Sequence, residues 1–182
     1  PCFRRDVKAC DRMKGETFCM HLYLLRHGIA EEAQAGENDA ARALTSDGRR
    51  KLRQVLKAVA EAKVKPTLLW SSELKRAIQT AEIAKSVLGY PGEILRTKAL
   101  APGAEPEQLW EEIRVHRDET SLMLVGHNPQ FDHLAPYLLG APQLAVGFKK
   151  GAIMRIDIES FSARPKGTLC WYLTAKLSSS RE

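Results

Sequence analysis

The sequence predicts a three-layer α/β/α domain built on a mostly parallel central sheet. Two observations lead to this prediction. Short apolar runs of strand length alternate along the chain with segments whose apolar residues recur at helical spacing. Several of these runs end in polar residues, as buried strands of an open α/β sheet do. The length of 182 residues suits one domain, which we expect to span residues 21–177.

The first strand is expected at residues 21–28, where an apolar run ends in Arg-His-Gly. The polar, Ala-rich stretch at 29–45 is predicted to be a loop. A helix should begin near Ser46 and end before Pro66, because apolar residues recur there every three or four positions.

A second strand is expected at 67–72, followed by a helix that Ser72 caps and Gly89 ends. A short strand should follow near residues 94–97. Pro106 suits the first position of the next helix, because proline lacks the N–H that is unpaired there anyway.

The most hydrophobic strand is expected at residues 121–127. Asn128 and Pro129 then form an N-cap and first-position pair for a further helix. Two more strands, at 152–158 and 168–175, complete the predicted sheet.

The two ends of the chain differ from this pattern. Residues 1–20 show neither helical nor strand periodicity and lack the apolar core of a signal peptide, so we expect a disordered or non-native extension, with Met20 as the natural start. Three of the four cysteines lie within it at spacings that match no zinc motif. Residues 178–182 are expected to form a flexible tail.

Composition excludes several classes of protein. Apolar residues make up 44% and charged residues 27% of the chain, close to average globular usage. No apolar run is long enough to cross a membrane. The net charge of +6 is spread too evenly to predict nucleic-acid binding. With neither an export signal nor a disulfide pattern, we expect a cytoplasmic protein.

Polar residues with a shared chemistry follow three of the predicted strands. Arg26 and His27 end the first, Arg76 lies in the helix after the second, and His127 and Asn128 end the fourth. The carboxyl ends of parallel strands meet at one edge of the sheet, where ligands bind. Guanidinium groups match the oxygens of phosphate, and a histidine among them can accept a phosphoryl group. The sequence therefore predicts a phosphoryl site.

Three segments, LYLLRHGIAEE at 22–32, WSSELKRAIQTAEI at 70–83 and LMLVGHNP at 122–129, resemble the histidine phosphatase superfamily. The resemblance covers roughly residues 21–175 and implies the phosphoglycerate mutase-like fold. It is nearest to the small SixA-type phosphohistidine phosphatases.

The resemblance implies a role for each residue of the site. His27 is expected to be the nucleophile that carries the phosphoryl group, with Arg26 and Arg76 holding the phosphoryl oxygens. His127 is expected to donate a hydrogen bond to them. The substrate-binding groups expected beside these are the backbone N–H groups of Gly28 and Asn128.

The larger members of the superfamily carry a helical insertion over the site and an acidic residue that protonates the leaving group. In this sequence the two segments that could cover the site, at 29–45 and 98–105, are short, and an acid for that role is harder to identify. Glu105 is the one candidate near the expected place for a general acid, although it also suits the start of a helix. The imidazole of a phosphohistidine departs more readily than an alcohol and needs less help from an acid. We therefore predict hydrolysis of protein phosphohistidine, without a metal or cofactor.

Alternatives from other classes stay open at this point. One is a phosphatase for small phosphomonoesters, and another is a phosphate-binding module without turnover. A nucleic-acid binder drawn by the positive charge is a third, weaker alternative. The expected partner is a phosphohistidine-bearing protein, such as a phosphotransfer domain or a phosphocarrier protein. The oligomeric state is left open.

Overall fold

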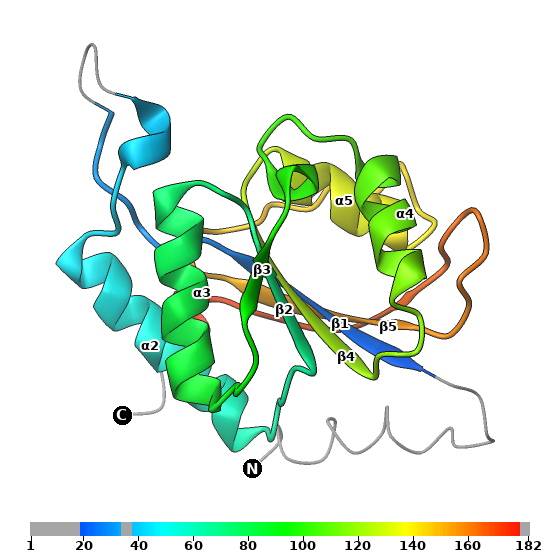
Figure 1. Ribbon diagram of the computed structural model, residues 1–182, viewed down its shortest axis with the longest axis horizontal. Helices are drawn as coiled ribbons and strands as arrows, with labels where there is room; N and C mark the ends of the chain where they lie inside the picture. The colour runs from blue at the N-terminus through cyan, green and yellow to red at the C-terminus, as the bar shows by residue number, and fades with distance from the viewer. Residues whose placement is uncertain (1–18, 34–37, 179–182) are drawn as a thin grey trace.

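A six-stranded sheet forms the centre of the computed structural model, which describes residues 19–33 and 38–178 (Figure 1). Its strand order is β3-β2-β4-β1-β5-β6. The first four of these strands run parallel, and β5 and β6 run antiparallel to their neighbours. The strands are β1 (Met20–Arg26), β2 (Leu68–Ser71), β3 (Ile94–Arg96), β4 (Ser121–Gly126), β5 (Ile153–Ile158) and β6 (Thr168–Leu173). The predicted fold class is confirmed.

Helices cover both faces of this sheet, with α2 and α3 on one face and α4 and α5 on the other (Figure 1). The helices are α2 (Ser46–Glu61), α3 (Lys75–Leu88), α4 (Pro106–Val115), α5 (Gln130–Leu138) and α6 (Ala175–Ser178). Two short 3-10 helices, η1 (Asp39–Ala41) and η2 (Lys98–Leu100), lie in the connections. None of the helices in the described part of the chain has the length and apolar composition needed to cross a membrane.

The central strand β1 separates two hydrophobic cores. Leu22 and Leu24 are fully buried in the core that α4 and α5 cover. Leu25 is buried in the other core, beneath α2 and α3. Successive side chains of a strand point to opposite faces, so an unbroken apolar run is what a strand covered on both sides requires.

Two predicted helix starts are wrong in detail. Helix α3 begins at Lys75 with Leu74 as its N-cap, and the Ser72 hydroxyl accepts a hydrogen bond from the Leu74 N–H at 3.3 Å. Ser72 therefore shapes the turn before the helix and does not cap it. Pro129, and not Asn128, is the N-cap of α5; the Asn128 amide nitrogen donates to Asp132 and Phe148, and its Oδ1 accepts no hydrogen bond from the described residues.

The predicted N-terminal extension lies almost wholly outside the described residues, as do residues 179–182 of the predicted tail. Strand β1 begins at Met20, which pairs with Ile158 and is fully buried. Met20 is therefore part of the folded domain in this structure.

Candidate active site

The register of the parallel strands brings the two predicted histidines together. Arg26 is paired with Gly126 across β1 and β4, so His27 and His127 follow at neighbouring strand ends. Their ring centroids lie 4.9 Å apart, with the rings tilted by 50°. Arg76 comes from the first turn of α3, which follows the neighbouring strand β2.

The His27 ring is buried and held in one orientation. The residue is 6% exposed, and Nδ1 lies 2.7 Å from the carbonyl oxygen of Gly28. A carbonyl oxygen only accepts hydrogen bonds, so Nδ1 carries the proton and Nε2 keeps its lone pair. Burial, together with the charges of Arg76 and Arg26, lowers the pKa of His27 to about 4. The ring is therefore neutral at pH 7.

His127 lies beside it with both ring nitrogens buried and without a hydrogen-bond partner among the described residues. Burial, His27 and Arg76 lower the pKa of His127 to about 3. The Nε of Arg26 is likewise buried and unpaired among these residues. Buried polar atoms are nearly always hydrogen-bonded, so unpaired ones gathered at one place indicate a ligand site.

A network around Phe148 holds the Arg26 side chain. The Phe148 carbonyl accepts hydrogen bonds from Nη1 of Arg26 and, at 3.2 Å, from the Asn128 side-chain amide. The same Asn128 amide donates to Asp132 at 2.6 Å, and Asp132 accepts from the Phe148 N–H at 3.0 Å. The Asn128 side chain thus ties the start of α5 to the loop that positions Arg26.

Arg76 pairs with an acid that the sequence analysis missed. Nη1 donates to the carbonyl oxygen of Asp39 at 2.8 Å, and Nη2 donates to its carboxylate at 3.0 Å. Asp39 lies in η1, within the segment predicted as a polar loop. The contact spans 37 residues, and its formation depends on the path of that loop. No motif or periodicity in the sequence marks Asp39 as special.

The carboxylate of Asp39 is held in its ionised form. Hydrogen bonds from Arg42 and Arg76 lower its pKa below the usual value. Asp39 also acts on His127, since its charge favours the protonated form of that ring. A carboxylate therefore lies close enough to His127 to influence the charge of its ring.

Two other expected groups are placed differently. The Gly28 N–H donates to the Thr80 hydroxyl at 3.2 Å, so this amide is engaged within the protein, contrary to the expectation that it faces a ligand. Glu105 is exposed at the N-cap of α4. The contacts found in the described ranges join Glu105 to neither histidine and neither arginine of the site.

A second polar cluster lies at the opposite end of β1. Ligand atoms of Cys19, His21 and Asp157 lie within 4.8 Å of one another. Arg155 shares this cluster, with its Nε and Nη2 donating to both carboxylate oxygens of Asp157 at 2.7 and 2.9 Å. A guanidinium on the carboxylate occupies the positions that a metal would need, so the cluster is better described as an ion pair than as a metal site.

The lowered pKa of His27 has a direct test. We expect the His27 imidazole to stay neutral until the pH falls to about 4, whereas an ordinary histidine protonates near 6.5. Titration of the imidazole NMR signals, with the His27 signal assigned by its loss in His27→Ala, measures the midpoint. A His27 midpoint near 6.5 would contradict the buried, cation-flanked environment described above.

Known proteins resemble this chain in sequence and in fold. The model of the histidine phosphatase superfamily (branch 1) matches residues 22–101. An uncharacterised protein of Picosynechococcus sp. is 30% identical over 147 residues, which cover 80% of this chain and 88% of that protein.

The solved structures of similar fold include proteins named as phosphohistidine phosphatases and proteins named as small-molecule phosphatases. The protein histidine phosphatase SixA in complex with tungstate superposes with a TM-score of 0.79 at 23% identity, over 86% of this chain and 98% of that chain. A protein of Agrobacterium tumefaciens described as phosphohistidine phosphatase SixA gives 0.73 at 25% identity, over 85% and 97%. A mycobacterial glucosyl-3-phosphoglycerate phosphatase gives 0.63 at 18% identity, over 83% and 97%. The chain belongs to the histidine phosphatase superfamily, and within it the resemblance is to the SixA type.

Proposed function

We propose that this protein hydrolyses phosphohistidine on another protein through a phosphoryl group carried by His27. Membership of the superfamily supports phosphatase activity in general. The observation that carries the proposal is the state of His27, a buried neutral ring whose Nε2 lone pair is available beside Arg26, Arg76 and His127.

In the first step, Nε2 of His27 attacks phosphorus while the bond from phosphorus to the substrate nitrogen breaks. The negative charge stays on the three equatorial oxygens, where Arg26 and Arg76 offset it. His127 is neutral at pH 7 and carries one ring N–H, which donates a hydrogen bond to a phosphoryl oxygen. The leaving imidazole departs as a neutral ring when its other nitrogen carries a proton.

In the second step, water attacks the phosphorus of phospho-His27. The bond to Nε2 breaks, inorganic phosphate forms, and the ring returns to its neutral state. The hydrogen bond from Nδ1 to Gly28 fixes the ring through both steps, which keeps Nε2 aligned with phosphorus.

The acids of the structure favour a nitrogen leaving group over an alcohol. An alkoxide needs a proton from the enzyme, and an effective donor holds that proton near neutral pH. Asp39 is kept ionised by Arg42 and Arg76, and no contact in the described part of the chain joins Glu105 to a histidine or arginine of the site. The substrate proposed here is a phosphohistidine on a phosphotransfer domain or a phosphocarrier protein.

The test compares two substrates in the presence of EDTA. A protein carrying phosphohistidine and p-nitrophenyl phosphate are given to the wild-type protein under the same conditions. We expect kcat/KM for phosphohistidine to exceed that for the ester by at least about tenfold. Faster hydrolysis of the ester would overturn the proposed substrate and leave only the general phosphatase activity.

Asp39 also supports a second candidate, a phosphatase for small phosphomonoesters. Once a phosphoryl group takes the hydrogen bonds of Arg76, the Asp39 carboxylate loses one of the partners that lower its pKa and can take up a proton from solvent. That proton would then pass to the leaving alcohol. A solved structure of similar fold bears the name of such an enzyme, although a likeness at 18% identity shows the fold alone.

Asp39→Asn separates the two candidates. If phosphohistidine is the substrate, we expect the variant to bind orthovanadate several-fold more tightly, because a carboxylate no longer competes for Arg76, and to keep its hydrolysis of phosphohistidine. Asp118→Asn, an exposed acid before β4, is the matched control. A hundredfold loss confined to the ester would identify Asp39 as a proton donor and favour the small-molecule candidate.

A further inference from the structure

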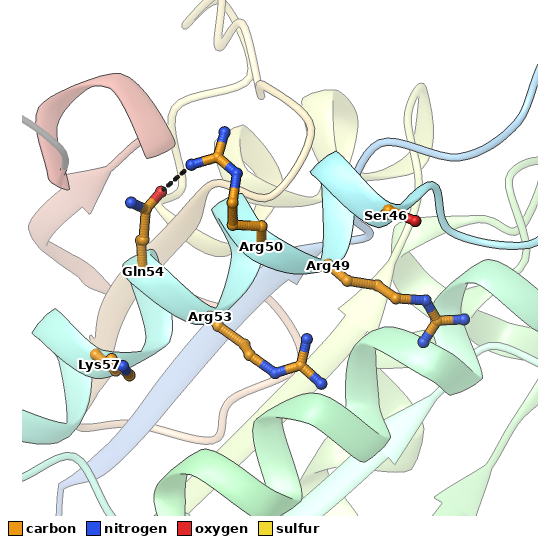
Figure 2. Close-up of a pocket in the computed structure, with 6 residues that line it drawn as sticks. All are labelled: Ser46, Arg49, Arg50, Arg53, Gln54 and Lys57. Atoms are coloured by element: carbon orange, nitrogen blue, oxygen red, sulfur yellow. Dashed lines mark hydrogen bonds between the residues drawn. The ribbon is translucent and has the colours of Figure 1, made fainter.

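The surface of α2 carries a row of cations that the chemistry described above does not use. Arg49, Arg53 and Lys57 follow one another at four-residue spacing, which places them along one side of the helix. With three neighbours they line a shallow hollow of about 410 Å³ (Figure 2). The other lining residues are Ser46, Arg50 and Gln54, so the hollow is cationic and contains no acid.

These charges are left without counter-ions in the described part of the chain. Arg50 binds Asp47 at 2.6 Å, and Asp47 also binds Lys51 at 2.7 Å, so the one acid of the first turn is already engaged. The ion pairs among the described residues include neither Arg49, Arg53 nor Lys57. Figure 2 shows Arg49 and Arg53 extending from the same side of the helix.

The helix that carries the row begins against the segment that follows His27. The Thr45 N–H donates to the Ile29 carbonyl at 3.0 Å, and a Cβ on Gly48 would lie 2.1 Å from the same oxygen. The first turn of α2 therefore rests directly on the backbone that follows His27. From Arg49 the row runs away from that contact for about 12 Å, at the rise of an α-helix.

A second element also brings cations near His27. Lys149 and Lys150 are exposed and immediately precede Gly151, whose N–H donates to the His27 carbonyl at 2.9 Å. The charge of Lys150 contributes to the lowered pKa of His27. Positive charge from two separate elements therefore flanks the candidate active site.

We propose that the α2 row, defined as Arg49, Arg53 and Lys57, docks an acidic surface of the protein that carries the phosphohistidine. This inference rests on the proposed function. Salt screens exposed charges beyond about 8 Å at physiological ionic strength, so the row acts on groups that come into contact with it. A folded partner whose phosphohistidine reaches His27 would cover the first turns of α2, which places its acidic side chains against the row.

Nucleic acid is a poorer fit to this surface. A row of three cations about 12 Å long neutralises few phosphates, and no aromatic side chain lies among the residues of the hollow. A phosphate backbone bound there would also give no role to the packing of the first turn of α2 against the segment after His27.

The test uses two triple variants with the same change in net charge. Arg49→Glu, Arg53→Glu and Lys57→Glu reverse the row. Lys65→Glu, Arg117→Glu and Lys166→Glu reverse three exposed cations in the connections before β2, β4 and β6, at the end of the sheet opposite His27. The probes are a histidine phosphotransfer domain with an acidic surface, phosphorylated on its histidine, and free phosphohistidine.

We expect the row variant to lose at least about tenfold in kcat/KM on the phosphorylated domain, mostly through KM, because rim charges act on association. Its turnover of free phosphohistidine should match that of the wild type. The control variant should stay within about twofold of the wild type on both probes. Equal losses in the two variants, or no loss in either, would overturn the docking proposal.

A binding measurement separates failure of the docking from failure of the proposed function. In a His27→Ala background, which should not turn over the probe, the dissociation constant of the phosphorylated domain should rise at least about tenfold on reversal of the row alone. If the dissociation constant rose in this way but the wild-type protein did not hydrolyse the phosphorylated domain, the docking surface would be supported and the proposed reaction refuted. If reversal of the row abolished binding to duplex DNA and left the affinity for the phosphorylated domain unchanged, the row would be a nucleic-acid site and the proposal would be overturned.

Discussion

Replacement of His27 by alanine is expected to lower turnover of phosphohistidine by at least about 10⁴-fold, because the attacking atom itself is removed. Nε2 of His27 is the one ring nitrogen of this site that both carries a lone pair and is fixed by a hydrogen bond on the opposite side of its ring. Acid-labile phosphate on the protein, trapped by rapid quench, should disappear together with the activity.

His133→Ala is the matched control, since this exposed histidine of α5 lies on the helix that follows the site. It should retain wild-type turnover and the trapped phosphoryl group. Substantial turnover by His27→Ala would remove His27 from the mechanism and direct attention to His127, the other buried histidine.

Arg76→Ala is expected to lose about 10²–10³-fold in kcat/KM, the scale of a lost electrostatic contact in the transition state. The substitution removes a buried cation whose partner, Asp39, is exposed, so it leaves no unpaired charge inside the protein. The fold should therefore survive, which the melting temperature of the purified variant checks.

Arg76→Lys gives the sharper comparison, because it keeps the charge and loses the two-pronged guanidinium. An activity between those of the wild type and Arg76→Ala would show that geometry matters as well as charge. Lys75→Ala, on the exposed side of the same helical turn, should change neither activity nor melting temperature. Full activity in Arg76→Ala would mean that Arg76 serves only to hold Asp39.

The sheet and the meeting of His27 with His127 could be predicted because both follow from local pattern and a general rule. Strand β4 has four consecutive apolar side chains, at 122–125, which require burial on both faces, and parallel strands bring their carboxyl ends to one edge. That rule alone is enough to predict that Arg26, His27 and His127 lie together.

The remaining details depend on the path of the chain through space. Asp39 reaches Arg76 from a loop, and the neighbouring sequence does not distinguish it from Glu31 or Glu32, which lie in the same loop. The amide of Gly28 is taken by Thr80, a residue of α3 that is distant in sequence. Side chains with several suitable partners, such as Asn128, are assigned by tertiary packing and not by their own preference for helix caps.

The bridge between Asp39 and Arg76 gives the resting protein an internal competitor for its own substrate. Any anion must displace the carboxylate first, and the cost is the same for every anion, so the bridge weakens all of them by a common factor. Inorganic phosphate has no further contacts with which to recover that loss, whereas a macromolecule held elsewhere on the surface does. We therefore expect inorganic phosphate to inhibit this protein more weakly than it would inhibit a variant without the bridge.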